Sequence, residues 1–431
     1  MSRTYRDPVH QEITLNSDDP VENLIIELID TREFQRLRWL RQLGTGWFTF
    51  HGAEASRFQH SVGAMYVAKL MYEKISQDLI LDEATAAEYK ALVLVAALLH
   101  DIGHGPFSHS SEKINNIMHE TWTQTLINSK ETEIHTTLEK YQPGLSEKVI
   151  SVLNKTYPVK FLSSIVNSQL DCDRFDYLIR DSFYTGTSYG QFDLNRVISS
   201  IKVNLEHDCL VVSGEKGMLA VEDYLYARYS MYMQVYQHKK CLASDSLLLK
   251  LFKRAKILIK GKRVAFIEEP VYNWLMQPEK LTVQEFLLVD DINIMHHIKH
   301  WMHEKDVILK DLARRFIERD IFKAIKIDNH ADGTIEEKLE EMYNIKSQEL
   351  RRKNLDPDYY LDSITIAANP YSFYNPSQIE NNKYSKAIFV EANNGELREI
   401  STLSHVVDSL VKNSFANSWF IYSPVPQYAS A

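Results

Sequence analysis

Apolar residues recur at the three- and four-residue spacing of an amphipathic helix along most of the first half of the chain. From Val21 to Gln42 the leucines share one face, and the glycine-containing segment 43–46 is expected to end this helix. A looser alternation over residues 1–20, with two Asp-Pro pairs, predicts a short β-hairpin before it. The first half is therefore predicted to be an α-helical bundle. Its further helices are expected at 61–78, 84–101, 112–128, 131–141, 145–154 and 160–182.

The second half mixes helical and β-like patterns. Residues Val197 to Val212 alternate like a β-segment, and a tyrosine-rich helix is predicted from about 219 to 241. A charged helical stretch from about 283 to 350 leads into a linker near 353–362. The chain is expected to close with a small α+β unit. That unit comprises short strands at Asp362–Ala368, Ala387–Ala392 and Trp419–Tyr422, and a helix at Leu403–Ser414.

Composition supports a mainly α fold. Glycine and proline are scarce, 14 and 12 of 431 residues, which disfavours turn-rich all-β folds. The predicted architecture is a helical bundle with a small β-hairpin and a small α+β C-terminal unit. Four segments are predicted: 1–56 as hairpin and first helix, 57–182 as helical core, 183–355 as helical extension, and 356–431 as the α+β unit.

Charge and cysteine content narrow the classes of function. The net charge is -9, whereas a nucleic-acid-binding surface needs a basic footprint. The three cysteines lack CxxC spacing, so neither a disulfide framework nor a thiolate zinc site is indicated. The N-terminus is too polar for a signal peptide, and the longest apolar run, Ala91 to Leu99, is far shorter than the ~20 residues of a spanning helix. We expect a cytoplasmic protein with no membrane or nucleic-acid partner.

The sequence LLHDIGHGPFSH, at 98–109, is the most distinctive motif for chemistry. His100 and Asp101 end the most apolar helix, where polar groups need partners. Imidazole nitrogens and carboxylate oxygens are natural ligands of Mn, Fe, Zn or Mg. His60, just before a helix, and Asp173, in LDCDRFDYLIRD, would complete a mixed ligand set that leaves positions open for water and phosphate. Taken alone, a single histidine near a helix end is more often a helix cap or a core residue than a metal ligand.

The order His, His-Asp, then a distant Asp resembles the HD superfamily of metal-dependent phosphohydrolases. Within it, the chain is similar to deoxynucleoside triphosphate (dNTP) triphosphohydrolases of the SAM-and-HD-domain branch, although it opens at the DPVH segment without a SAM domain. The resemblance implies an HD helical bundle at 57–182. It is carried by DPVH (7–10), DTREFQRLRWLRQLGTGWF (30–48), RFQHSVG (57–63), LLHDIGHGPFSH (98–109), HET (119–121), DCDRFDYLIRD (171–181) and ARYSMYMQVYQHK (227–239).

Enzymes of this family split a dNTP into a deoxynucleoside and inorganic triphosphate. By resemblance, a divalent metal of unassigned identity would be held by His60, His100, Asp101 and Asp173. His109 is the candidate for protonating the leaving O5′, and Glu112, on the same helical face, would orient its ring. The remaining candidates in the catalytic group are His104, His119 and Glu120, which would contact phosphate or water. Helix-end capping is the alternative for His104 and His109.

A second set of residues would bind the substrate. The resemblance assigns phosphate contacts to Arg174, Tyr177 and Arg228, the sugar 3′-OH to Asp181, and the sugar and base to Gln42. Tyr177 would also exclude ribonucleotides by packing on the 2′ face. Arg57 adds a cation, and Leu43, Tyr236 and Gln237 shape the base end. Two positions depart from close relatives: Arg174 stands where Lys is usual, and Tyr232 replaces a His. Surface charge is the alternative for the arginines, and helix packing is the alternative for the tyrosines.

Regulation and assembly follow from the same resemblance. Relatives are activated by a guanine nucleotide, GTP or dGTP, through positions matching Asp30, Gln35 and Arg38, and they form homo-oligomers, dimers or tetramers. The alternative is that DTREFQRLR, at 30–38, is an ordinary amphipathic helix with a charged face and binds no nucleotide.

Two other functions and one decoy stay open at this point. The metal site also suits another HD phosphohydrolase, a nucleotidase or phosphodiesterase, and a nucleotide-sensing protein is a third candidate. The decoy is MHHIKHWMHEKD, where His296 and His300 lie one helical turn apart. No carboxylate motif supports a metal there, so an exposed helix carrying His296, His297, His300 and His303 is the preferred interpretation.

Overall fold

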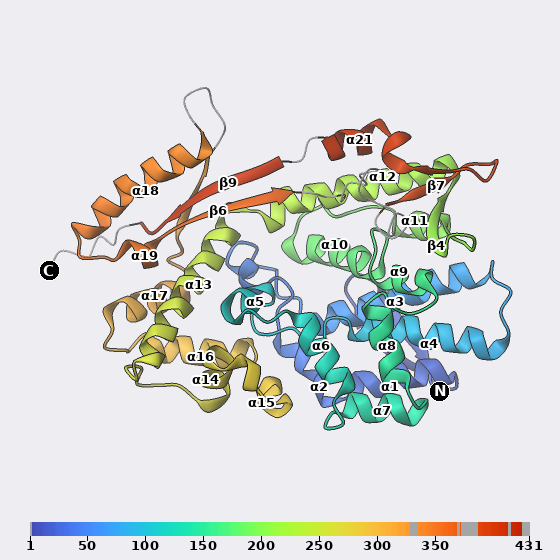
Figure 1. Cartoon of the computed structure of the whole chain (residues 1–431), viewed down its shortest axis with the longest axis horizontal. Helices are drawn as coiled ribbons and strands as arrows, with labels where there is room; N and C mark the ends of the chain where they lie inside the picture. The colour runs from blue at the N-terminus through green and yellow to red at the C-terminus, as the bar shows by residue number, and fades with distance from the viewer. Residues whose placement is uncertain (1, 328–333, 369–370, 372–386, 413–414, 425–431) are drawn as a thin grey trace.

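Helices dominate the computed structural model of the chain, as the sequence predicts (Figure 1). The structure describes residues 2–327, 334–368, 371, 387–412 and 415–424. The predicted N-terminal hairpin forms from β1 (Ser2–Asp7) and β2 (Gln11–Asn16), paired antiparallel from Ser2 opposite Asn16 to Asp7 opposite Gln11. None of the described helices is long and apolar enough to cross a membrane.

Several predicted helices are shorter than the hydrophobic pattern indicates. The helix expected over 21–42 is divided into α1 (Pro20–Asp30), α2 (Arg32–Gln35) and a 3₁₀ turn (Arg36–Trp39). Thr31 makes the break, because its hydroxyl donates to Leu28 O and receives a hydrogen bond from Phe34 N. The apolar spacing continues through such breaks, so periodicity alone does not reveal them.

Two more predicted helices are divided in the same way. Residues 112–128 become α5 (His109–Asn115) and α6 (His119–Asn128), separated at Asn116, which has a φ of 60°. Residues 160–182 become α9 (Lys160–Val166) and α10 (Cys172–Thr185), where Asp171 caps the second helix. Both breaks begin a new helix close to a candidate site residue.

The core of the molecule lies where α3 (Arg57–Ser76) packs between α4 (Glu83–Leu99) and α10. Every side chain from Ala91 to Leu99 is buried, which explains the longest apolar run in the sequence. Gly63 brings α3 against α10, because a Cβ there would overlap Asp176 and Arg180. This packing brings the N-terminal turn of α3, the end of α4 and the first turn of α10 together.

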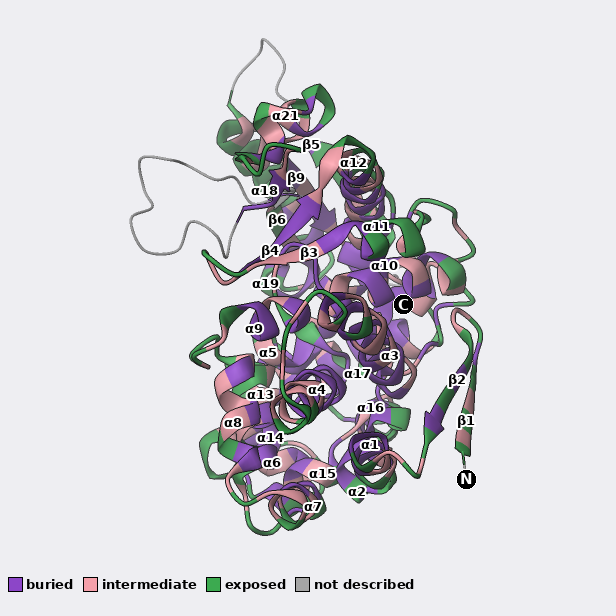
Figure 2. Ribbon diagram, turned by 90° about the vertical axis from the view of Figure 1, so that its right-hand side faces the viewer, coloured by how far each residue is buried: buried purple, intermediate pink, exposed green. Residues whose placement is uncertain are grey.

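The other helices lie beside this core, and those between about residues 240 and 360 are at the left in Figure 1, while Figure 2 shows the buried residues in purple between the helices. A π-helical turn (Tyr232–Tyr236) ends α12, so the tyrosine-rich helix predicted to 241 stops earlier. The remaining helices of the described residues are α7 (Glu133–Tyr141), α8 (Leu145–Leu153), α11 (Leu194–Ser200), α12 (Gly214–Met231), α13 (Lys239–Lys260), α14 (Glu269–Met276), α15 (Val283–Leu288), α16 (Asp291–Trp301), α17 (Val307–Ile317), α18 (Ile335–Arg351), α19 (Pro357–Tyr360) and α21 (His405–Lys412), with 3₁₀ turns at Gly44–Phe48, Pro278–Lys280 and Ile400–Thr402.

Strands from separate parts of the chain form two further sheets. One has the order β3 (Ile201–Asn204), β4 (Cys209–Ser213), β7 (Phe389–Glu391) and β8 (Leu397–Glu399), with β4 and β7 parallel. The other is antiparallel, with β9 (Phe415–Tyr422) between β5 (Lys323–Ile327) and β6 (Leu361–Ala368). The C-terminal strands therefore pair with strands that precede residue 356.

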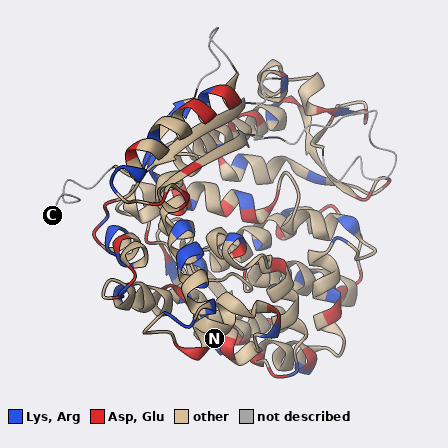
Figure 3. Cartoon of the chain, turned by 60° about the vertical axis from the view of Figure 1, so that its left-hand side comes forward, with Lys and Arg blue, Asp and Glu red and all other residues tan. Residues whose placement is uncertain are grey.

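These sheets correct parts of the sequence prediction. The β-like stretch at 197–212 begins as α11 and continues as β3 and β4, and β5 interrupts the stretch predicted as helical to 350. The expected linker contains α19 and the start of β6. Residues 413–414 of the predicted last helix lie outside the described residues. Figure 3 shows lysines and arginines interspersed with aspartates and glutamates along the helices.

Candidate active site

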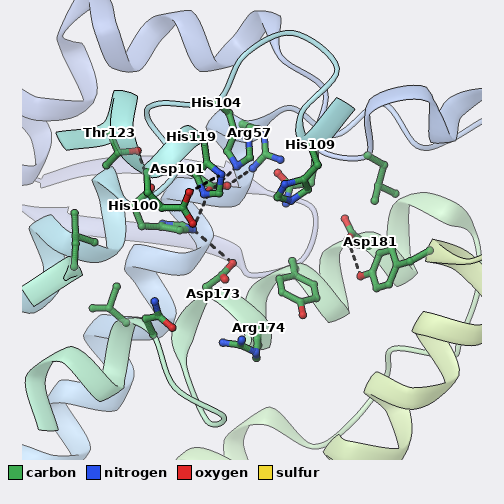
Figure 4. Close-up of a pocket in the computed structure, with 18 of the residues that line it drawn as sticks. Arg57, His100, Asp101, His104, His109, His119, Thr123, Asp173, Arg174 and Asp181 are labelled. Atoms are coloured by element: carbon green, nitrogen blue, oxygen red, sulfur yellow. Dashed lines mark hydrogen bonds and ion pairs between the residues drawn. The ribbon is translucent and has the colours of Figure 1, made fainter. Parts of the chain in front are cut away.

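Four predicted metal ligands converge at the junction of three helices. His60 lies in the first turn of α3, His100 and Asp101 follow the end of α4, and Asp173 lies in the first turn of α10. Asp173 Oδ1 is 3.1 Å from His60 Nε2 and 3.5 Å from His100 Nε2. Asp101 places Oδ2 3.6 Å from His60 Nε2 and Oδ1 3.5 Å from His100 Nε2 (Figure 4 shows three of the four).

The hydrogen bonding of these histidines fits a bound cation. His100 Nδ1 donates to Ala97 O at 2.7 Å, and His60 Nδ1 lies 2.8 Å from Asp176 Oδ2, so both rings turn Nε2 inward. Within the described part of the chain, both Nε2 atoms are buried without a hydrogen-bond partner. One ligand atom each from His60, His100 and Asp173 lies within 4.8 Å of the others. A mixed set of imidazole and carboxylate is the donor chemistry that divalent metals take.

The electrostatics favour positive charge at the same point. Burial lowers the pKa of His60, but contacts with Asp173 and Asp176 outweigh burial and raise it to about 10. Burial also opposes ionisation of Asp173, yet His100 and His60 hold its pKa well below the usual range. The carboxylates therefore stay ionised and attract a cation, which a divalent metal would supply.

A buried ion-pair network lies behind His60, and the sequence prediction missed it. Asp176, one turn after Asp173, receives hydrogen bonds from Arg180 Nε and Nη2 at 2.8 and 2.9 Å. His10 Nε2 lies 2.6 Å from Asp176 Oδ1, and Arg180 Nη1 donates to Asp7 Oδ2 at 2.8 Å. The network ties the N-terminal hairpin to the ring of His60 and fixes its tautomer. Its members occur in the DPVH and DYLIRD segments, whose spacing did not reveal that they meet.

A second cluster of histidines lines the cavity beside Asp101. His104 Nε2 lies 3.2 Å from Asp101 Oδ1, and the ring of His104 stacks on that of His119 with centroids 3.8 Å apart. Burial and the nearby Arg57 lower the pKa of His104 strongly, so this ring stays neutral. Glu120, mostly exposed, lies beside His119 with Oε2 3.4 Å from Nδ1.

Glu112 joins the two outer histidines. Its Oε1 lies 2.5 Å from His119 Nδ1 and its Oε2 lies 3.3 Å from His109 Nδ1. Burial opposes ionisation, but the two histidines outweigh it and lower the pKa of Glu112 below its usual range. His109 is two-thirds exposed and faces the cavity (Figure 4). The predicted pairing of His109 with Glu112 is therefore present as a contact.

The loop before His109 is held in an uncommon backbone conformation. Phe107 and Ser108 have φ of 56° and 55°, which non-glycine residues rarely adopt. Asp291 accepts hydrogen bonds from Phe107 N at 2.7 Å and Arg41 N at 2.9 Å. Arg57 donates to Ser108 Oγ at 3.0 Å and forms an ion pair with Asp101. Asp291, which the sequence did not single out, thus clamps two walls of the site.

Most predicted substrate residues line one cavity of about 590 Å³ together with three of the four predicted metal ligands, His100, Asp101 and Asp173. Asp181 and Tyr236 contact each other on its lining, where the tyrosine hydroxyl donates to Asp181 Oδ2 at 2.8 Å. Arg228 and Gln237 are buried just outside the lining, where Arg228 Nη1 donates to Gln169 Oε1 at 2.9 Å. Predicted residues on the lining are Gln42, Leu43, Arg57, His100, Asp101, His104, His109, His119, Glu120, Asp173, Arg174, Tyr177, Asp181 and Tyr236.

Polar atoms without partners concentrate in these residues. Burial raises the pKa of Asp181 to about 7, despite the hydrogen bond from Tyr236. Arg174 pairs with Asp171, yet its Nε is buried without a partner. Such atoms are costly unless a ligand satisfies them. Among the described residues, those in the predicted site are Gln42 Oε1, His60 Nε2, His100 Nε2, His104 Nδ1, Arg174 Nε, Asp181 Oδ1 and Arg228 Nε.

The cavity also has an amide-rich end that the sequence prediction missed. Gln124 and Asn154 line it, with Gln124 Nε2 donating to Asn154 Oδ1 at 3.1 Å, and Asn167 lies nearby on the lining. These residues come from three different segments around α6, α8 and α9. No spacing in the sequence marks them as a group.

The three residues predicted to bind an activator lie outside this cavity. Asp30 forms an ion pair with Arg3, Gln35 Oε1 accepts from Arg38 Nε at 2.8 Å, and the Arg38 guanidinium lies 3.6 Å from the Phe58 ring centroid. The histidines in and just after α16 are also separate from the cavity. His296, His300 and His303 are exposed as predicted, whereas His297 is buried, which corrects that part of the interpretation.

Comparison with known protein families and structures relates this chain to HD-domain proteins. Residues 57–155 match the HD domain, a range that includes His60, His100 and Asp101. The uncharacterized protein YwfO of Bacillus subtilis is 38% identical over 408 residues, 95% of this chain and 89% of YwfO. A phosphohydrolase structure from Bacteroides thetaiotaomicron superposes with a TM-score of 0.81 at 28% identity, covering 98% of this chain and 100% of that one.

A more distant relative carries a named activity. The human deoxynucleoside triphosphate triphosphohydrolase SAMHD1 is 30% identical over 291 residues. The match covers 59% of this chain and 44% of the human protein, so it spans less than half of that longer relative.

Proposed function

The chain belongs to the HD-domain phosphohydrolase family, and on that premise we propose that it hydrolyses dNTPs to a deoxynucleoside and inorganic triphosphate. A hydrolase of this family requires the metal-ligand cluster, which is present. The triphosphohydrolase activity is named only for relatives such as SAMHD1. The substrate assignment therefore depends on the rest of the cavity.

One observation carries the substrate assignment: the unpartnered buried polar atoms lie at both ends of the cavity. Next to Asp173, Arg174 lines the cavity and, among the described residues, keeps a buried Nε without a partner, which suits the oxygens of a polyphosphate. At the other end, Asp181 keeps Oδ1 as a buried acceptor, which suits a sugar hydroxyl. Inorganic phosphate or a free base would satisfy only one of these ends, whereas a nucleotide would satisfy both, and a triphosphate offers the arginine the most oxygens.

The reaction adds water to the α-phosphorus and breaks its bond to O5′. A divalent metal held by His60, His100, Asp101 and Asp173 would polarise the phosphoryl group and lower the pKa of water. Arg57, paired with Asp101, adds positive charge beside the same centre. The leaving O5′ needs a proton as the bond breaks.

His109 is the residue proposed to supply that proton. It faces the cavity from the start of α5, and Glu112 beside it stays ionised because its pKa is low. Glu112 contacts His109 Nδ1 at 3.3 Å and would orient the ring for proton transfer to the leaving oxygen. The Asp291 clamp on the preceding loop would hold His109 at the cavity wall.

Sugar selection is assigned to Tyr177 and Asp181. Both line the cavity, and the ring of Tyr177 lies 6.1 Å from that of Tyr236. In the proposed mode, Asp181 accepts from the 3′-OH while Tyr177 occupies the space that a 2′-OH would need. The cavity thereby discriminates deoxyribose from ribose by shape.

Activation by GTP or dGTP through Asp30, Gln35 and Arg38, and assembly into a dimer or tetramer, are part of the proposal. Gln35 and Arg38 bind each other in the structure, so an activating nucleotide would have to replace that hydrogen bond. The carboxylate and the amide suit a purine edge, and the guanidinium suits a phosphate.

The decisive experiment is product analysis by anion-exchange chromatography. Purified protein with Mn²⁺ or Mg²⁺ is incubated with each dNTP, with all four, and with added GTP, beside an Asp101→Ala control. We expect deoxynucleoside and triphosphate in equal amounts from the wild type and neither from the variant. Release of monophosphate, or no turnover in any mixture, would refute the proposal and favour another HD phosphohydrolase or a nucleotide sensor.

A further inference from the structure

A smaller side cavity adjoins the main cavity of the active site. Its volume is about 190 Å³, and it shares Gln42, Leu43, His109 and Tyr236 with the lining of the main cavity. Pockets for whole drug-sized ligands begin at roughly 300 Å³, so this space suits one fragment of a ligand, such as a planar ring system. We refer to it as the side chamber.

The walls of the side chamber are mainly apolar and partly aromatic. Phe50, Phe107 and Val235 contribute to them beside Leu43 and Tyr236. Gly44 lets the chain pass close to Phe107: its φ is 51°, and a Cβ there would lie 2.9 Å from Phe107 O. Flat apolar walls of this kind bind a nucleobase by its faces, which leaves selection to polar groups at its edge.

Asp245, on α13, is the carboxylate that lines the side chamber. Thr45 Oγ1 donates to its Oδ1 at 2.5 Å, and Ser110 Oγ lies 3.5 Å from the same oxygen. Because both contacts reach Oδ1, Oδ2 keeps its capacity to accept from a ligand. Burial raises the pKa of Asp245, although Thr45 opposes the shift, and a partly desolvated acceptor gains most from new donors.

We propose that the side chamber receives the nucleobase of the substrate and that Asp245 selects bases with hydrogen-bond donors on their edge, guanine first. This inference rests on the proposed function. Guanine presents a ring N–H and an exocyclic amino group side by side, and Oδ2 of Asp245, with two acceptor sites, can accept from both. Adenine and cytosine present one amino group next to an acceptor nitrogen. Thymine presents two carbonyl oxygens around a single N–H, and those oxygens would face the carboxylate unfavourably.

The test measures binding of the four deoxynucleosides, because they are not substrates and their ranking does not depend on turnover. Isothermal titration is carried out with wild type, Asp245→Asn and Asp223→Asn. Asp223 is exposed on α12 and lines neither cavity, so its variant is a matched control for charge removal. Circular dichroism and thermal melting establish that each variant is folded.

We expect wild type to bind deoxyguanosine tightest and thymidine weakest. Asp245→Asn replaces one acceptor with a donor, so the deoxyguanosine-to-thymidine affinity ratio should fall about 10- to 100-fold, the size of a hydrogen bond to a charged group. Asp223→Asn should leave the ratio unchanged.

Equal affinities for the four deoxynucleosides in wild type would overturn the inference, even if Asp245→Asn did not fold. An unchanged ratio in folded Asp245→Asn, or no binding of any deoxynucleoside at millimolar concentration, would overturn it as well. A guanine preference lost in Asp245→Asn, found in a protein that releases no triphosphate, would support the chamber and refute the proposed reaction. The two proposals therefore fail by different measurements.

Discussion

Two regions of this protein are rich in histidine, and they use it in opposite ways. In α16, His297 is buried and fully partnered: Nδ1 lies 2.8 Å from Asn293 O, and Nε2 accepts from Glu268 N at 3.1 Å. His300 stacks on Phe266 with ring centroids 3.9 Å apart. In the active site, by contrast, His60 and His100 bury Nε2 without a partner and face Asp173.

This difference indicates that a metal site depends on histidines and carboxylates from several helices meeting at one point, rather than on the number of histidines. The α16 histidines follow one another on a single helix, where ring nitrogens are satisfied by the nearby backbone or remain exposed. The active-site residues come from three helices whose ends meet, and carboxylates fill the space between them. A cation then has several donors within reach at one point.

The largest effect is expected when one histidine in each of the two regions is replaced and the variants are compared. His100→Ala should lose bound metal and reduce triphosphate release by roughly 10³-fold, because a catalytic metal contributes several kcal/mol to the transition state. His296→Ala should keep both within about twofold, as exposed substitutions usually do. Metal content by plasma mass spectrometry and product release measure the two effects. Equal metal loss in both variants would contradict the assignment of the ligands.

A smaller effect is expected from the network behind His60. Asp176→Asn should weaken metal affinity about 10- to 100-fold, since the amide no longer fixes the His60 tautomer or pairs with Arg180. The matched control is Asp306→Asn, which removes a carboxylate that binds Arg254 far from the ligands. Both variants lose an ion pair and should melt earlier.

Only Asp176→Asn should shift a titration of the metal against a chelator. If Asp306→Asn shifted it equally, the network would be structural rather than a positioning device for the ligand.

The smallest effect concerns pH and the sugar end of the cavity. The pKa of Asp181 is raised to about 7, so the carboxylate is protonated below that pH and accepts from a 3′-OH above it. The preference in kcat/KM for a dNTP over its 2′,3′-dideoxy analogue should therefore rise a few-fold from pH 6 to 8. Taking this ratio cancels titration of the phosphates and of the metal ligands, which both substrates share.

Asp181→Asn is the control, because its amide does not titrate, and its ratio should be flat across this range. A wild-type ratio that is also flat would show that Asp181 does not contact the 3′-OH.

What could be predicted from the sequence depended on how far apart in the chain the residues that form each feature lie. The candidate ligands His60, His100, Asp101 and Asp173 occur in short motifs near helix ends, and the resemblance assigned them to one metal and added most of the substrate residues. Helix breaks at Thr31 and Asn116 were missed, because they depend on a hydroxyl capping contact and a left-handed residue that do not interrupt the apolar spacing.

Residues that act across the fold could not be predicted at all. Asp291 is 184 positions from Phe107, whose backbone it holds, and Asp176 is 166 positions from His10. Neither carboxylate lies in a spacing that distinguishes it from the many surface acids of this chain. The same is true of Asp245, which reaches the side chamber only because α13 packs against the 3₁₀ turn at Gly44–Phe48.

Local periodicity and short motifs were enough to predict the helical class and the buried helix that ends in His-Asp. They also predicted the chemical types of the candidate ligands. Tertiary structure decided which acids meet which bases. Burial creates that information: a carboxylate acquires a shifted pKa or an unpartnered oxygen only when distant helices close around it and exclude water. The candidate metal site, the Asp291 contacts to the His109 loop and the side chamber all arise from that closure.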